Sequence, residues 1–140
     1  MNDTFDISNQ MFNLFMASAE LASALGIASD ATVADYDNKM RRVAADATLL
    51  DPNDTTLFPF FDFSWIPAAG QQKNHLTFKG VIEFNLWTSQ MYDAEIIYKI
   101  LKGILKSAFD DADMIYSAAV SSGIPNIYRY RMRLSVLCGS

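Results

Sequence analysis

Three arginines stand at alternate positions near the end of the chain, where residues 126–138 read NIYRYRMRLSVLC. A period of two places Arg129, Arg131 and Arg133 on one face of a strand, with apolar residues on the other. On a solvated face these arginines pair with acids of neighbouring strands, such as Glu83 or Asp62. On a partner-facing surface the same ladder binds a phosphate backbone or an acidic protein. Both interpretations stand at this level.

The other residues with reactive or metal-binding side chains are few. Asp110, Asp111 and Asp113 cluster where we expect a solvated helix end. The single histidine, His75, is expected on a polar surface loop, and the single cysteine, Cys138, on an inward strand face as an inert thiol. One histidine and one cysteine supply neither a zinc set nor a Cys–His pair, and no glycine-rich phosphate loop or GxSxG motif occurs. We therefore expect no catalytic, cofactor-binding or metal-binding residues, and no enzyme.

Composition favours one folded domain of 140 residues with a sizeable core, since 51% of the residues are hydrophobic. We expect a helical part over 6–50 and a sheet-plus-helix part over 57–138. No apolar run reaches the length of a membrane span, and the chain starts without a basic signal-peptide region, which predicts a soluble, unprocessed protein. Residues 1–62 carry ten acidic and three basic side chains, whereas residues 63–140 carry six and eight. This asymmetry suits head-to-tail contacts between identical subunits, or solvated N-terminal loops.

Periodicity predicts an α+β fold with a mainly antiparallel four-stranded sheet, packed with an N-terminal helix and with a helix after the second strand. Proline has no N–H to donate, so we expect either that the first strand starts at Pro59 or that this strand lies at an edge of the sheet. The predicted helices cover about 6–25, ended by Gly26, then 34–49 and 90–109; the predicted strands cover 57–65, 76–88, 114–120 and 126–138.

The stretch between the first two strands is polar and too long for a tight hairpin, which predicts a projecting docking arm. Its candidate docking residues are Gly70, Gln71, Gln72, Lys73 and Asn74. Trp65 and Trp87 flank this arm and are expected in the core, at a subunit interface or around a pocket. A small enzyme or ligand-binding domain remains an alternative, with a pocket between the sheet and helix 90–109 and with Trp87 and Tyr92 at its mouth.

Several segments resemble the tail terminator, or tail completion and tail-to-head joining, proteins of long-tailed bacteriophages. The resemblance spans about residues 57–138. It rests on the strand LFPFFDFSWIP, the strand and helix LTFKGVIEFNLWTSQMYDAEIIYKILKGIL, and the closing YRYRMRLSVL. The N-terminal helix fits by position, and residues 28–56 are longer and more acidic than the family pattern.

The resemblance implies a structural virion protein that forms a ring, usually a hexamer, at the top of the phage tail. Such a ring ends tail-tube polymerisation and joins the tail to the head connector, and it is assembled in the host cytoplasm. The implied partners are further copies of the chain, the tail tube protein, a head–tail connector or stopper, and DNA that passes through the lumen without sequence recognition. Neither a membrane nor a cofactor is implied, and Arg129, Arg131 and Arg133 would face the lumen or a partner. A head–tail stopper or a tube-like protein is the alternative within the same assembly.

Overall fold

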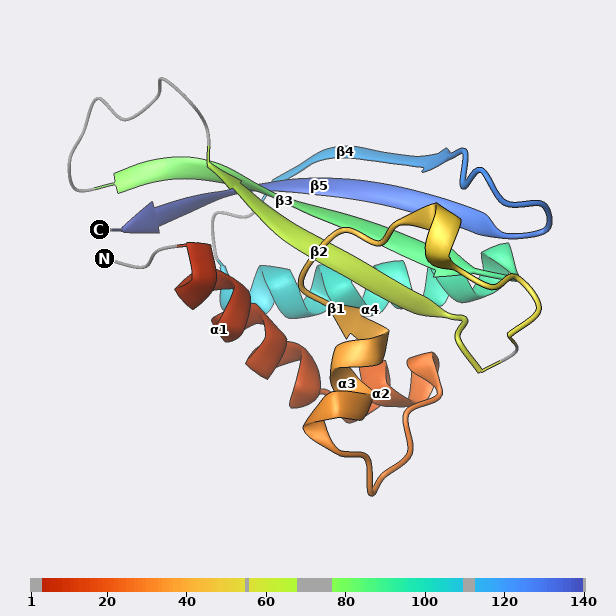
Figure 1. Ribbon diagram of the computed structural model, residues 1–140. Helices are drawn as coiled ribbons and strands as arrows, with labels where there is room; N and C mark the ends of the chain where they lie inside the picture. The colour runs from red at the N-terminus through yellow and green to blue at the C-terminus, as the bar shows by residue number, and fades with distance from the viewer. Residues whose placement is uncertain (1–3, 55, 68–76, 110–112, 140) are drawn as a thin grey trace.

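The computed structural model describes residues 4–54, 56–67, 77–109 and 113–139, which form an α+β fold with one mixed sheet and the α-helices on one side of it (Figure 1). The five strands lie in the order β1-β2-β3-β5-β4. The elements in chain order are α1 (Thr4–Met16), α2 (Ala19–Leu25), α3 (Val33–Lys39), β1 (Met40–Arg41), the 3-10 helix η1 (Ala47–Leu49), β2 (Phe60–Pro67), β3 (Thr77–Thr88), α4 (Met91–Ala108), β4 (Asp113–Val120) and β5 (Tyr128–Gly139).

Four of the strands are antiparallel neighbours, and their extents confirm the predicted strands to within a few residues. The expected four-stranded sheet is nevertheless wrong in detail, because β1 adds a fifth strand parallel to β2 through Met40–Phe61 and Arg41–Asp62. Two residues are too few to show a period of two in the sequence. The first predicted strand corresponds to β2, which begins at Phe60 rather than at residue 57. It starts directly after Pro59, as the proline predicts.

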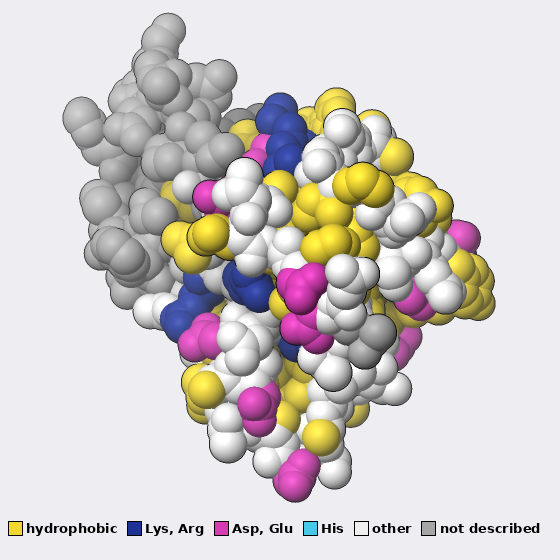
Figure 2. Space-filling view, turned by 45° about the vertical axis from the view of Figure 1, so that its right-hand side comes forward, with side chains coloured by type: hydrophobic (Ala, Val, Ile, Leu, Met, Phe, Trp, Pro, Cys, Tyr) yellow, Lys and Arg dark blue, Asp and Glu magenta, His cyan; other side chains and the backbone are white. Residues whose placement is uncertain are grey.

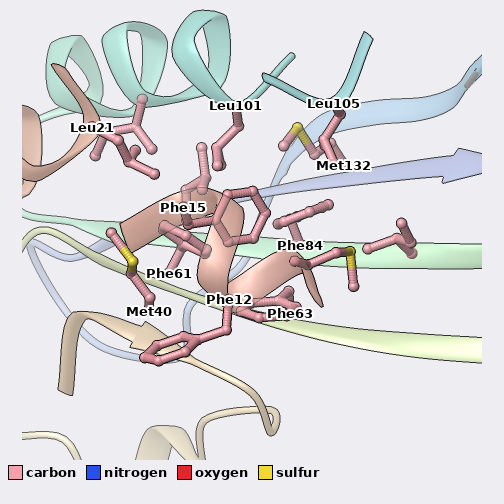
Figure 3. Close-up of a cluster of buried hydrophobic side chains, with 14 of the residues drawn as sticks. Phe12, Phe15, Leu21, Met40, Phe61, Phe63, Phe84, Leu101, Leu105 and Met132 are labelled. Atoms are coloured by element: carbon pink, nitrogen blue, oxygen red, sulfur yellow. The ribbon is translucent and has the colours of Figure 1, made fainter. Parts of the chain in front are cut away.

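The main core lies between the sheet and helices α1, α2 and α4 (Figure 3). Phe15 of α1 points into the middle of this core, with its ring edge-on to Phe61, Phe63 and Phe84 at centroid distances of 5.4, 5.3 and 5.9 Å. Edge-to-face contacts of this kind stabilise beyond the area they bury. Helix α4 buries one stripe, formed by Ala94, Ile97, Leu101 and Leu105.

The N-terminal region differs from its predicted helices. The expected single helix over 6–25 is interrupted at Ala17, because the Ser18 side chain accepts a hydrogen bond from the Leu21 N–H and starts α2. Gly26 ends α2 in the left-handed conformation, as predicted. The expected helix over 34–49 is wrong beyond Lys39, where the chain enters β1 and then a loop that contains η1.

Some predicted features fall outside the described residues: the arm residues Gly70, Gln71, Gln72, Lys73 and Asn74, together with His75, Asp110 and Asp111. The side chains of Asp113 and Cys138 are likewise outside the described part. Among the helices that are described, none is long and apolar enough to span a membrane.

Candidate functional site: the outer face of the sheet

The sheet face opposite the helices carries the three arginines, and it is organised in rows that run across the strands. In one row Arg129 of β5 lies opposite Trp87 of β3, which lies opposite Phe60 of β2. The next row joins Arg131, Asn85 and Asp62, and a third joins Arg133, Glu83 and Ser64. Because paired residues of adjacent strands point to the same face, the side chains of each row lie side by side.

The first row is a stack of cations and aromatic rings. The guanidinium of Arg41 lies over the Phe60 ring at 4.3 Å, and that ring stacks on Trp87 at 6.1 Å and 8°. The guanidinium of Arg129 lies 4.8 Å from the Trp87 ring centre. Four strands thus contribute to one continuous stack, in which each cation meets an aromatic face.

A second apolar cluster covers this end of the outer face. The segment 43–59 crosses it, and Leu50 and Phe58 pack on Phe60, Trp87 and Ile127. Trp87 is therefore only 1% exposed, although it points away from the main core. Trp65 belongs to the main core on the opposite face, so the two tryptophans do not frame a common pocket.

Asp62 is a buried hydrogen-bond hub beneath that cover. Its carboxylate accepts from the Asn85 Nδ2, the Trp87 Nε1 and the Ala45 backbone N–H at 2.9, 2.9 and 3.1 Å. Burial raises the pKa of Asp62, while the three donors and the charge of Arg129 act in the opposite direction. The hub ties the loop after β1 to β2 and β3, which is a structural role.

The arginines are anchored through their Nε atoms. Arg129 and Arg131 both donate Nε–H to the Asn85 Oδ1 at 3.0 Å, and Arg133 donates to the Glu83 Oε1 at 2.8 Å. Glu83 also lies 3.7 Å from the Arg131 Nε. The predicted pairing with Glu83 is confirmed, whereas Asp62 serves the hub instead and Asn85 takes its place.

The exposure of the ladder changes along the strand. Burial, followed by the charge of Arg131, lowers the pKa of Arg129. The side chains of Arg131 and Arg133 are 25% and 40% exposed, so the ladder is most accessible at the Arg133 end. On the face seen in Figure 2, basic side chains lie in separate groups close to acidic ones.

The hollow expected between α4 and the sheet exists, but its lining differs from the prediction. Tyr92, Tyr98 and Tyr130 line a hollow of ≈ 540 Å³ between α4 and β5. Trp87 lies on the other face of the sheet and takes no part. The charged side chains of the hollow, Glu95 and Lys99, pair with each other at 3.1 Å.

Three features of the outer face were not predicted as a unit: the Asp62 hub, the role of Asn85 and the covering segment. One signal was available, because Phe60 and Trp87 fall on the same strand faces as the polar residues Asp62, Ser64, Glu83 and Asn85. Within the described residues, no group of three or more His, Cys, Asp or Glu side chains is placed to hold a metal ion. A comparison of the sequence with protein-family models finds no match, and neither does a comparison with curated proteins.

Proposed function

We propose that the chain is a structural subunit that assembles with copies of itself into a ring. Following the resemblance of residues 57–138, we place this ring, of six copies, at the top of a phage tail. There it would end tail-tube polymerisation and join the tail to the head connector. The observation that carries the proposal is the exposed edge strand β4.

Strand β4 is last in the sheet, and among the described strands it pairs only with β5. Of the usual protections of an edge, β4 carries a charged side chain only at its first residue, Asp113, and between Met114 and Val120 it has no proline and no charged side chain. Ile115 and Tyr116 are 54% and 39% exposed. An irregularity in the pairing falls between Met114 and Tyr116, so the stretch from Tyr116 to Val120 is regular. The stretch from Tyr116 to Val120 lacks such protection, which suits pairing with another chain.

The opposite side of the sheet offers a complementary edge. Strand β1 pairs with β2 only at Phe61 and Asp62, and no described strand pairs with the outer edge of Phe63 to Trp65. Successive antiparallel pairings make β2 and β4 run in opposite directions. A copy rotated about a ring axis would therefore bring its β2 antiparallel to β4 of its neighbour. Repetition of such a head-to-tail contact closes a ring when the rotation fits a whole number of copies.

The proposal is tested by adding the purified chain to tails from a phage mutant that lacks it. A terminator ring would hold tails at one length and restore joining to heads. A stopper would leave tail length unchanged and affect only joining or DNA retention. Purified chain that neither binds tail ends nor changes tail length or joining would refute the proposed role.

A further inference from the structure

We propose that Arg131 and Arg133 bind carboxylates of a second copy of this chain, supplied by its acidic segment 46–54. The inference rests on the proposed ring, because it names the charged part of the contact between neighbouring subunits.

The first step is that the ladder has donors left over. Each guanidinium uses its Nε–H within the sheet, and the Nη groups of Arg131 and Arg133 have no hydrogen-bond partner among the described residues. The guanidinium of Arg133 lies 5.4 Å from the ring centre of Tyr116 on the edge strand β4. Nε anchoring holds both planar groups, and the Tyr116 ring supports that of Arg133, so their outer edges are free in an arrangement that favours bidentate carboxylate binding.

The second step is that positive charge exceeds negative charge around Arg131 and Arg133. Glu83 is the only carboxylate that pairs with Arg131 and Arg133 in the described structure. The oxygens of Asp62 are occupied by the hub, and the other acceptor of the ladder, Asn85, is neutral. One carboxylate therefore serves two guanidinium groups that are held side by side, and a further anion would relieve their repulsion.

The third step identifies the anion. Asp46, Asp51 and Asp54 are exposed, and within the described residues none of them forms a salt bridge. Their Oδ1 atoms accept local turn hydrogen bonds, which fix the segment. The bonds from Thr48 and Thr56 lower the pKa of Asp46 and Asp54, so both remain ionised at neutral pH.

The fourth step is position. The acidic segment follows Ala45, whose N–H donates to Asp62 on β2, and its Leu50 packs with Phe60 and Trp87 at one end of the outer face. Arg131 and Arg133 lie on β5, one strand from the β4 edge. Head-to-tail contact through these two edges brings the segment of one copy toward the ladder of the next. A nucleic-acid backbone also carries suitable anions, but the net charge of −5 opposes a polyanion. The acidic segment supplies the same chemistry from within the assembly.

The experiment measures self-association by sedimentation at low and high salt. Two sets of substitutions are compared, Arg131→Gln with Arg133→Gln, and Asp46→Asn with Asp51→Asn and Asp54→Asn. Asparagine keeps the oxygen that accepts the turn bonds, so the second set tests charge without removing the turns. Lys102→Gln with Lys106→Gln on α4 is the matched control for loss of two positive charges.

Each set should weaken self-association by about tenfold or more at low salt, and the control should not. Combining the two sets should weaken it no further than either set alone, because both remove the same contact. The inference would be overturned if the effects of the two sets on self-association were fully additive, or if neither set affected ring formation. Either result would leave the proposed ring itself unaffected. So would binding of a single-stranded oligonucleotide that depends on the arginines while self-association does not. A wild-type chain that stays monomeric would remove both the inference and the proposed ring.

Discussion

Replacement of Asp62 by alanine should be among the most destabilising single changes on the outer face. Asp62 is 2% exposed, and its removal leaves three donors without their acceptor: the Asn85 Nδ2, the Trp87 Nε1 and the Ala45 N–H. A buried donor without a partner costs about 1–3 kcal/mol. Allowing for partial relaxation, we expect a loss of about 3–6 kcal/mol, which is comparable with the whole stability of a small domain.

Asp62→Asn removes the charge of this side chain and keeps one of its two acceptor oxygens. The new amide oxygen can accept from Trp87 and Ala45, but the new NH₂ then faces the Asn85 NH₂. Asn85 cannot turn over without losing the Nε–H bonds of Arg129 and Arg131. We therefore expect a smaller loss, of about 1–3 kcal/mol.

Urea unfolding, followed by circular dichroism, measures both losses, with Ser64→Ala on the same face of β2 as the control. A loss below about 1 kcal/mol for Asp62→Ala would refute the reasoning, since it would mean that the three donors find other partners or are not buried.

Three further predictions concern the charge of Asp62, the glycines of β3 and α4, and the β4 edge. Burial raises the pKa of Asp62 above its value in the unfolded chain, so the native state binds this proton more tightly. The free energy of unfolding of wild type, relative to that of Asp62→Asn, should therefore be greatest below about pH 4 and should fall as pH rises through the pKa of Asp62 in the folded protein. Urea unfolding of both proteins across this range measures the difference, and a difference that grows with pH would contradict the prediction. Gly80→Ala should cost about 1–3 kcal/mol, because its Cβ would lie 2.2 Å from the buried Trp65 ring. Gly103→Ala on the exposed side of α4 meets nothing within 4 Å and should add about 0.5–1 kcal/mol; thermal melts that rank the two variants in the opposite order would show that the Trp65 ring is free to move. Ile115→Lys should weaken self-association by placing a charge on the β4 edge, whereas Val33→Lys, at a similarly exposed site on α3, should not; equal sedimentation profiles for the two variants would argue against that edge.

The sequence predicted the long elements because their patterns repeat several times. Strands β3 and β5 show the period of two over many residues, and the stripe of Ile97, Leu101 and Leu105 marks α4. The pairing of the arginine ladder with Glu83 was predictable for the same reason, since alternation fixes which residues share a face.

The remaining features depend on contacts that a local pattern does not contain. Asp62 reads as a solvated residue of an alternating strand, and only the covering segment 43–59 makes it a buried hub. The end of α3 at Lys39 has a similar cause: its Nζ donates to the carbonyls of Thr56, Leu57 and Pro59, at 2.8, 3.1 and 3.1 Å. This tertiary contact ties the end of α3 to the segment before β2. The helical spacing of apolar residues beyond position 39 is overridden by such contacts.

Closure of this chain into a ring, as we propose, would be visible in the mass of the purified protein in solution. Sedimentation velocity across a range of concentrations, with electron micrographs of the same samples, reports both the number of copies and their arrangement. We expect a closed species of about six times the 15.6 kDa of one chain, with a central opening. A single species of 15.6 kDa at every concentration, including in the presence of tail tubes, would contradict it.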